Sequence, residues 1–195
     1  MMNILIGFKR AKIQPLNSDG TAEGEVIVLE GTQNEGATQE ANISGLSAEP
    51  VKVYGSNVAY YVSQKGTGDV AIEFKFLDMP NAAEDTILGY KTDMELKAQF
   101  VGEDTEPPYC AVLLESSDTQ GNVALFGFFK GKFNKTDISL KTKEGGNLEP
   151  EGETYNFSAV SSDANDKSKG NSMVRFLGSK EDAAAIEALV LRTGA

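Results

Sequence analysis

The chain has 195 residues, with 18 Lys and Arg against 29 Asp and Glu, no His, no Trp and a single Cys. This length is typical of one domain, or of one domain with a sizeable insertion. The formal charge of -11 disfavours a nucleic-acid-binding protein, although it suits one that DNA passes without sticking. Without His, the commonest general base and metal ligand are missing.

The N-terminal apolar stretch, Ile4 to Ile6, is too short for the core of a signal peptide. No run approaches the ~20 apolar residues that a membrane span requires. A lone Cys cannot form an intramolecular disulfide, which is typical of a reducing compartment. These features predict a soluble protein that is neither secreted by the common route nor embedded in a membrane.

Residues 14–50 contain seven acidic residues and no Lys or Arg. This composition is too polar to bury much area, so we expect a flexible acidic segment, or arm, around 14–50. Val26 to Leu29 is the single strand-like piece within it. We further expect residues 31–42 to become ordered only against a neighbouring subunit.

Strand patterns dominate the middle of the chain. Residues 69–77 alternate between apolar and polar side chains, which predicts a strand with one face on a core. Residues 57–63 and 94–101 are further predicted strands. Residues 66–68, Gly-Thr-Gly, are a plausible turn between the strands 57–63 and 69–77. Together the predicted strands would form an antiparallel meander.

Residues 109–133 predict a long hairpin, with turn residues near Asp118. Both faces of both arms are apolar, and a strand of this kind must be covered on both sides. The second cover could be another part of the chain or a neighbouring subunit. The candidate subunit contacts on this hairpin are Leu113, Leu125, Phe126, Phe128 and Phe129.

Two helices are predicted. Residues 79–88 begin near Pro80 and are followed by Gly89, a residue that commonly ends helices. Residues 180–191 follow Ser179, whose hydroxyl can cap the first turn, and Gly194 is expected to end this helix. Residues 143–153 and 161–172 have the composition of mobile loops. The fold class is therefore mainly β (α+β), a sandwich or small barrel within a single domain spanning residues 1–195.

The sequence offers little chemistry. Cys110 lies in an apolar strand without a His to activate it, so a buried or interface thiol is favoured over a nucleophile. The acidic cluster at 103–106 lacks the ligand spacing of a calcium loop and favours a solvated loop. No pair of carboxylates is singled out for glycoside chemistry. We therefore predict no enzyme, no metal and no cofactor.

Five lysines, at positions 130, 132, 135, 141 and 143, form a local positive stripe. Considered together with the acidic segments 14–50 and 103–106, the stripe could be one half of a complementary subunit contact. A solvated surface is an equally good interpretation, because surface charges are usually only hydrated.

Five sequence blocks, taken together and in order, resemble the major tail proteins of long-tailed phages (siphophages) of Gram-positive bacteria. They are GFKRAKIQPL with NSDGT, VKVYGSNVAYYVSQKGTGDVAIEFKFLDMP, ILGY, EDTEPPYCAVLLES and FGFFKGKF. The resemblance covers about residues 7–180.

The resemblance implies a tail-tube β-sandwich or barrel, with a short helix on the outside, that assembles into stacked, commonly hexameric rings. These rings would form the conduit for DNA ejection. The implied partners are further copies of the chain and the tape measure, tail terminator and baseplate initiator proteins, in a virion tail assembled in the host cytoplasm.

DNA would pass through such a tube without specific binding, and an acidic wall repels it. The lumen-facing candidates are Glu73, Lys75, Glu115 and Asp118, and we expect Lys75 to pair with a carboxylate across strands. The alternative functions are a β-sandwich binding module of a phage tail, for a receptor or carbohydrate, and an acid-base hydrolase. Carbohydrate modules usually stack sugars on exposed aromatic side chains, and a chain without Trp weakens that alternative.

Overall fold

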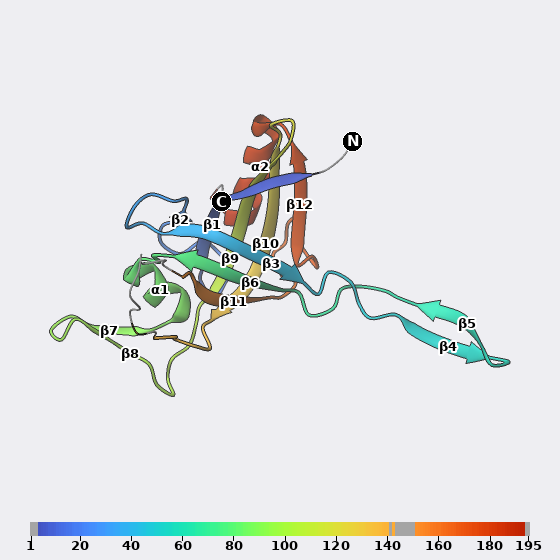
Figure 1. The fold of residues 1–195 in the computed structure, drawn as a ribbon, viewed down its shortest axis with the longest axis horizontal. Helices are drawn as coiled ribbons and strands as arrows, with labels where there is room; N and C mark the ends of the chain where they lie inside the picture. Colours follow the sequence, from blue (N-terminus) through green and yellow to red (C-terminus); the bar gives the residue numbers. More distant parts are fainter. Residues whose placement is uncertain (1–3, 141, 143–150, 194–195) are drawn as a thin grey trace.

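A computed structural model describes residues 4–140, 142 and 151–193, and it shows a strand-rich body with two helices and a long projecting hairpin (Figure 1). The strands are β1 (Leu5–Leu16), β2 (Ile27–Leu29), β3 (Ala37–Ser44), β4 (Val51–Gly55), β5 (Val58–Ser63), β6 (Ala71–Leu77), β7 (Lys91–Asp93), β8 (Ala98–Phe100), β9 (Tyr109–Asp118), β10 (Val123–Asn134), β11 (Glu153–Ala159) and β12 (Met173–Gly178). The helices are α1 (Asn81–Leu88) and α2 (Lys180–Leu191). Among the described residues, no helix is long and apolar enough to cross a membrane.

The main sheet has the strand order β2-β1-β9-β10-β11-β6-β3, and all of its pairs are antiparallel. Strand β10 is long enough to hold two neighbours on one edge, β12 along Val123–Phe128 and β11 along Gly131–Asn134. The sheet curls until β3 approaches β1, where the Thr38 hydroxyl donates a hydrogen bond to the Phe8 carbonyl at 2.8 Å. The predicted fold class, mainly β with two short helices, is confirmed.

The main core lies between the two halves of this curled sheet. The alternation predicted for β6 is present: Ile72, Phe74 and Phe76 point inward and are almost completely buried. The rings of Phe74 and Phe76 pack with those of β10 and β11, where the ring centroids of Phe133 and Phe157 are 4.9 Å apart. Helix α1 adds Ile87 and Leu88 to this core, where they pack in one cluster with the buried side chains of the sheet.

A second core lies on the other face of the β9–β10 hairpin, under helix α2 (Figure 1). Helix α2 contributes Ala183, Val190 and Leu191 to it. The hairpin predicted over 109–133 is confirmed, and the second cover that its apolar faces require is another part of the same chain. Gly127 lets the helix approach, because a Cβ atom there would lie 2.4 Å from a methyl carbon of Val190.

The two helices fall where the sequence predicts them. Gly89 ends α1 in the left-handed conformation, with a φ of 69°, and the backbone amide of Asp182 donates to the Ser179 hydroxyl at the start of α2. The end of α2 differs from the prediction: Arg192 takes the left-handed conformation at the C-cap, with a φ of 56°, and Gly194 lies outside the described residues.

The predicted meander is wrong. Strand β5 pairs with β4 rather than with β6, while β6 pairs with β3 and β11. Strand β3 was not predicted, because only Ala41 and Ile43 of this edge strand face the core and its other face is polar. The strand predicted over 94–101 is shortened to β8, since Asp93 accepts hydrogen bonds from two backbone amides and turns residues 94–97.

The predicted loops are placed only in part. Residues 143–150 lie outside the described residues, and Glu153 already begins β11. Residues 161–172 form a loop in which the hydroxyls of Ser162 and Ser168 hydrogen-bond at 2.7 Å. The mobility of both loops, and the flexibility of residues 14–50, stay predictions.

Candidate assembly surfaces

The five side chains that we expected to contact a neighbouring subunit lie mostly inside this one. Leu113, Leu125 and Phe129 are each 2% exposed beneath α2, and Phe128 is fully buried in the main core. Phe126 is half-buried at the edge of that core. Side chains packed in this way have little area left for a neighbour, so their role as subunit contacts stays a prediction without direct structural support.

Eight exposed large apolar side chains of the described residues lie instead on the β4–β5 hairpin and its two connecting segments, residues 46–67. We call these residues the arm from here on, in place of the acidic segment predicted over 14–50. The arm projects far from the body (Figure 1). Its exposed apolar side chains are Leu46, Val51, Val53, Tyr54, Val58, Tyr60, Tyr61 and Val62, which are between 48% and 83% exposed. A contiguous apolar patch of this kind marks an interaction site on a soluble domain.

Both faces of the arm are apolar. Val53 lies opposite Tyr61 on one face, and Lys52 lies opposite Val62 on the other. The tip is a tight turn in which Ser56 and Asn57 both have positive φ, 49° and 65°, the conformation that suits the twist of a two-residue hairpin. A two-stranded hairpin has no core of its own, so only another molecule can cover the arm.

Glycines hold the base of the arm in place. The amide of Gly68 donates to the carbonyl of Gly45 at 2.9 Å, closing the arm where it leaves β3 and enters β6. Gly45 has a φ of +72°, and a Cβ atom there would lie 1.9 Å from the carbonyl oxygen of Asp69. The position and direction of the arm therefore depend on the absence of a side chain at residue 45.

A second surface is the outward face of four neighbouring strands, β3, β6, β11 and β10, which we call the polar sheet face. The registers of these strands place on it Glu40, Asn42, Ser44, Ala71, Glu73, Lys75, Thr154, Asn156, Ser158, Lys132 and Asn134. All but Ala71 are polar. This is a sheet with one face on the core and one face for water.

The lysines of the polar sheet face are neutralised locally. Lys75 pairs with Glu40 on β3 at 3.3 Å, which confirms the predicted cross-strand pair. Lys132 pairs with Glu106 at 2.9 Å. Glu73 has no ion-pair partner among the described residues. With Glu106, the partner of Lys132, counted alongside the face, three carboxylates stand against two lysines, a formal charge of -1.

The rest of the positive stripe is also paired within the chain. Lys130 lies 2.7 Å from Asp163, and Lys135 lies 2.7 Å from both Glu84 and Glu153. The lysines at 141 and 143 lie outside the described residues. The described lysines of the stripe therefore offer few uncompensated charges to a partner.

The four lumen-facing candidates do not share one surface. Glu73 and Lys75 lie together on the polar sheet face, but Glu115 shares its side of β9 with Leu113, the side that α2 covers. Asp118 accepts hydrogen bonds from the backbone amides of Gln120 and Asn122 and so shapes the β9–β10 turn. A lumen-facing role stays a prediction for each of the four residues.

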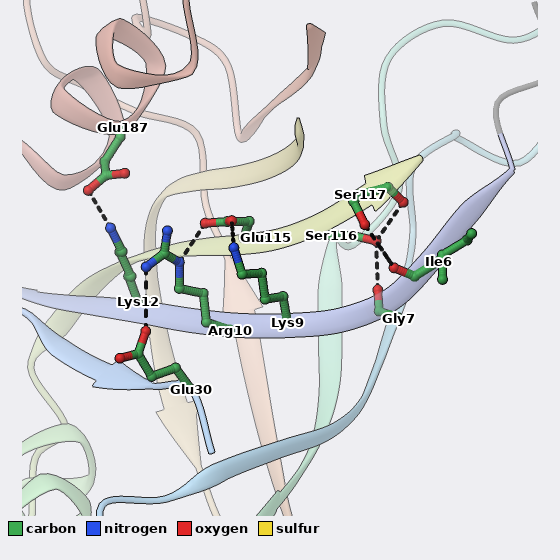
Figure 2. Close-up of polar contacts among 10 residues, drawn as sticks. All are labelled: Ile6, Gly7, Lys9, Arg10, Lys12, Glu30, Glu115, Ser116, Ser117 and Glu187. Atoms are coloured by element: carbon green, nitrogen blue, oxygen red, sulfur yellow. Dashed lines mark hydrogen bonds and ion pairs between the residues drawn. The ribbon is translucent and has the colours of Figure 1, made fainter. Parts of the chain in front are cut away.

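Glu115 is the centre of an ionic cluster that ties β1 to β9 (Figure 2). Lys9 donates to it at 3.0 Å, and Arg10 donates to its other oxygen while reaching Glu30 on the chain that follows β2. Burial alone would raise the pKa of Glu115, but the hydrogen bonds from Arg10 and Lys9 outweigh it and hold this pKa below its usual value.

Beside this cluster, β1 bulges at Gly7, which has a φ of 71°. The Ser116 hydroxyl donates to the Gly7 carbonyl at 2.6 Å (Figure 2). The bulge changes the register between Ile6 and Arg10. It leaves Ile4, Leu5 and Ile6 exposed at the start of the sheet.

The described residues hold no constellation typical of catalysis. Cys110 is fully buried, and burial raises the pKa of its thiol to about 12, so the thiol is protonated at neutral pH. No group of three or more Asp, Glu or Cys side chains within the described part of the chain could hold a metal ion.

The comparison with known families agrees with a molecule whose surface features suit assembly. A family model for phage tail tube proteins matches residues 7–182, which include the arm and the polar sheet face. No curated protein sequence matches the chain. A match over this much of the sequence establishes the family: the chain belongs to the phage tail tube proteins and is a structural component of a virion tail.

Proposed function

We propose that copies of this chain assemble in the host cytoplasm into stacked rings, hexameric as the sequence resemblance implies, that form the tail tube for DNA ejection. The observation that supports this proposal is the arm, whose two apolar faces have no cover in the subunit. Tape measure, terminator and baseplate initiator proteins are the partners that would set the length and ends of such a tube.

Removing apolar area from the arm tests the proposal. Tyr60→Ser combined with Tyr61→Ser should abolish tubes seen by negative-stain microscopy of concentrated protein. The circular dichroism spectrum should stay unchanged, because Tyr60 is 83% and Tyr61 is 58% exposed in the subunit. Val160→Ser, at a residue that is 44% exposed outside the arm, is the matched control and should form tubes normally. Tubes of normal yield from the arm variant would contradict the proposal.

We propose further that the polar sheet face lines the lumen. DNA carries one charge per ~1.7 Å of helix axis, so a basic wall would bind it through counterion release. Paired lysines, the unpaired carboxylate of Glu73 and the adjoining Glu106 instead give a polar wall with a formal charge of -1.

Charge reversal on this face tests the lumen assignment. Tubes of the wild-type chain should not retain double-stranded DNA at low salt. Tubes carrying Glu40→Lys and Glu73→Lys should retain it at low salt and release it at high salt. Equal DNA retention by tubes of the two proteins would place this face away from the lumen while leaving the tube itself standing.

A further inference from the structure

Helix α1 lies at the end of the molecule opposite the arm (Figure 1). Residues of this helix line an open apolar groove. Its volume is about 660 Å³. The residues that line it include Pro15, Ile27, Pro80, Ala82, Thr86 and Pro108. Glu23 and Glu25 also line the groove.

The β7–β8 hairpin extends this apolar surface. It follows α1 directly and is tied to it by the Thr92 hydroxyl, which donates to Asp85 at 2.6 Å. Met94 at its turn is 84% exposed, and Leu96 is 69% exposed. We call the groove and this hairpin, residues 23–27, 80–89 and 91–106 with Pro15 and Pro108, the acceptor end.

The arm and the acceptor end have opposite charge. The arm carries Lys52 and Lys65 against Glu49, a formal charge of +1. Segments 23–27 and 91–106 of the acceptor end carry seven acidic residues against two lysines, a formal charge of -5.

Some of these charges have no ion-pair partner within the chain. Among the described residues this holds for Lys52 and Lys65 of the arm and for Glu23, Glu25 and Glu95 at the acceptor end, whereas Asp104 pairs with Lys91 and Glu106 with Lys132. Complementary charge of this kind selects a partner and its orientation.

We propose that the acceptor end binds the arm of a second copy of this chain. The inference rests on the proposed self-assembly and adds to it the surface that receives the arm. In this pairing the tyrosines of the arm lie over the groove and over the Met94 turn. Apolar grooves accept aromatic anchors, and the thioether of Met94 makes favourable contacts with aromatic rings. Because the two surfaces are different and lie at opposite ends, each copy gives one contact and receives one, and the association repeats into a ring or a filament.

Cysteine cross-linking tests this pairing directly. Cys110 is fully buried, so newly introduced thiols react without interference. Ala59→Cys protein, changed at an exposed small residue of the arm, and Thr86→Cys protein, mixed under assembly conditions and oxidised, should give a disulfide-linked dimer. A single chain with both changes should give a ladder of multimers, since its two cysteines lie at opposite ends. The matched control, Ala59→Cys mixed with Thr154→Cys on the polar sheet face, should give no dimer above the background of random collision.

A charge swap supplies a second measurement. Lys52→Glu with Lys65→Glu should raise the protein concentration needed for assembly several-fold, and Glu25→Lys with Glu95→Lys should do the same. Combining all four changes should restore assembly in large part. If the wild-type chain forms tubes but the cysteine variants give no cross-link and the four changes give no restoration, the acceptor end is overturned and the proposed function stays intact. Wild-type protein that never self-associates would overturn both.

Discussion

Lys135 holds helix α1 against the sheet, and replacing it tests how much that attachment contributes to stability. Its ammonium lies between Glu84 of α1 and Glu153 of β11, and its side chain is 4% exposed. The Tyr155 hydroxyl donates to Glu153 at 2.9 Å, so the Lys135 ammonium, two carboxylates and a phenol form one polar cluster. Lys135→Met keeps an unbranched, flexible side chain that is one atom shorter, and removes the charge.

The expected cost of Lys135→Met is about 2–3 kcal/mol of unfolding free energy at neutral pH. Removing one partner of a buried ion pair costs ~3–5 kcal/mol, because a charge is left uncompensated. The figure is lower here because the side chain of Glu153 is 51% exposed and water can solvate it. Glu84, at 17% exposure, receives less of that compensation.

The cost should depend on pH. Hydrogen bonding from Lys135 lowers the pKa of Glu153, so its stabilisation is present above the unfolded value of ~4.3 and is lost as the pH falls through the folded pKa. Burial tends to lower the pKa of Lys135, but its hydrogen bonds to Glu153 and Glu84 raise it overall, so its stabilisation is lost at high pH. The difference between variant and wild type should be greatest between about pH 5 and pH 10.

Urea unfolding followed by tyrosine fluorescence or circular dichroism measures this difference. With a slope of ~1–3 kcal/mol per molar urea, the midpoint should fall by roughly 1 M or more. Lys167→Met, at an exposed loop lysine, is the control and should change stability by less than ~0.5 kcal/mol. Adding Glu84→Gln and Glu153→Gln to Lys135→Met should recover much of the loss. A cost that is small at pH 7, or unchanged at pH 3, would refute the reasoning.

Three further substitutions have defined outcomes. Gly45→Ala should displace the arm, because its Cβ would lie 1.9 Å from the Asp69 carbonyl oxygen; we expect tubes to be lost with the circular dichroism spectrum retained, and normal tubes in micrographs would contradict this. Gly127→Ala should destabilise the packing of α2 by ~1–3 kcal/mol in urea unfolding, and adding Val190→Ala should relieve part of the loss if the contact is the cause. Glu115→Gln should cost ~1–2 kcal/mol at pH 7. Because the pKa of Glu115 is lowered in the folded state, this cost should begin to shrink below the unfolded value of ~4.3 and should be lost as the pH falls through the folded pKa; a cost that persists below both values would argue against the ionic cluster.

The elements that sequence predicted well are those whose signal is local. Strand β6 alternates large apolar residues with polar ones, helix α1 has Pro80 at its start and Gly89 at its end, and helix α2 has the capping residue Ser179, so these local signals located them. Strand β3 has a polar outward face and only two inward apolar residues, Ala41 and Ile43, so its pairing with β6 gives no local pattern.

The candidate contacts show a different limit of sequence reasoning. The apolar side chains on both faces of the β9–β10 hairpin indicate that both faces are covered, but they do not identify what covers them. A signal was available: Ala183, Val190 and Leu191 give α2 an apolar stripe that needs a partner surface. The apolar residues of the arm match the pattern of a buried strand equally well, since alternation carries no information about whether a core exists beneath it.

The arm is an insertion within a hairpin, because its two ends join β3 and β6, which are direct neighbours in the sheet. Gly45 and Gly68 already bring those ends within hydrogen-bonding distance. The entropy of closing a loop grows slowly, by ~0.6 kcal/mol for each doubling of its length. Insertions and deletions in the arm are therefore tolerated by the body, and evolution can lengthen, shorten or exchange this segment while the sheet keeps its register.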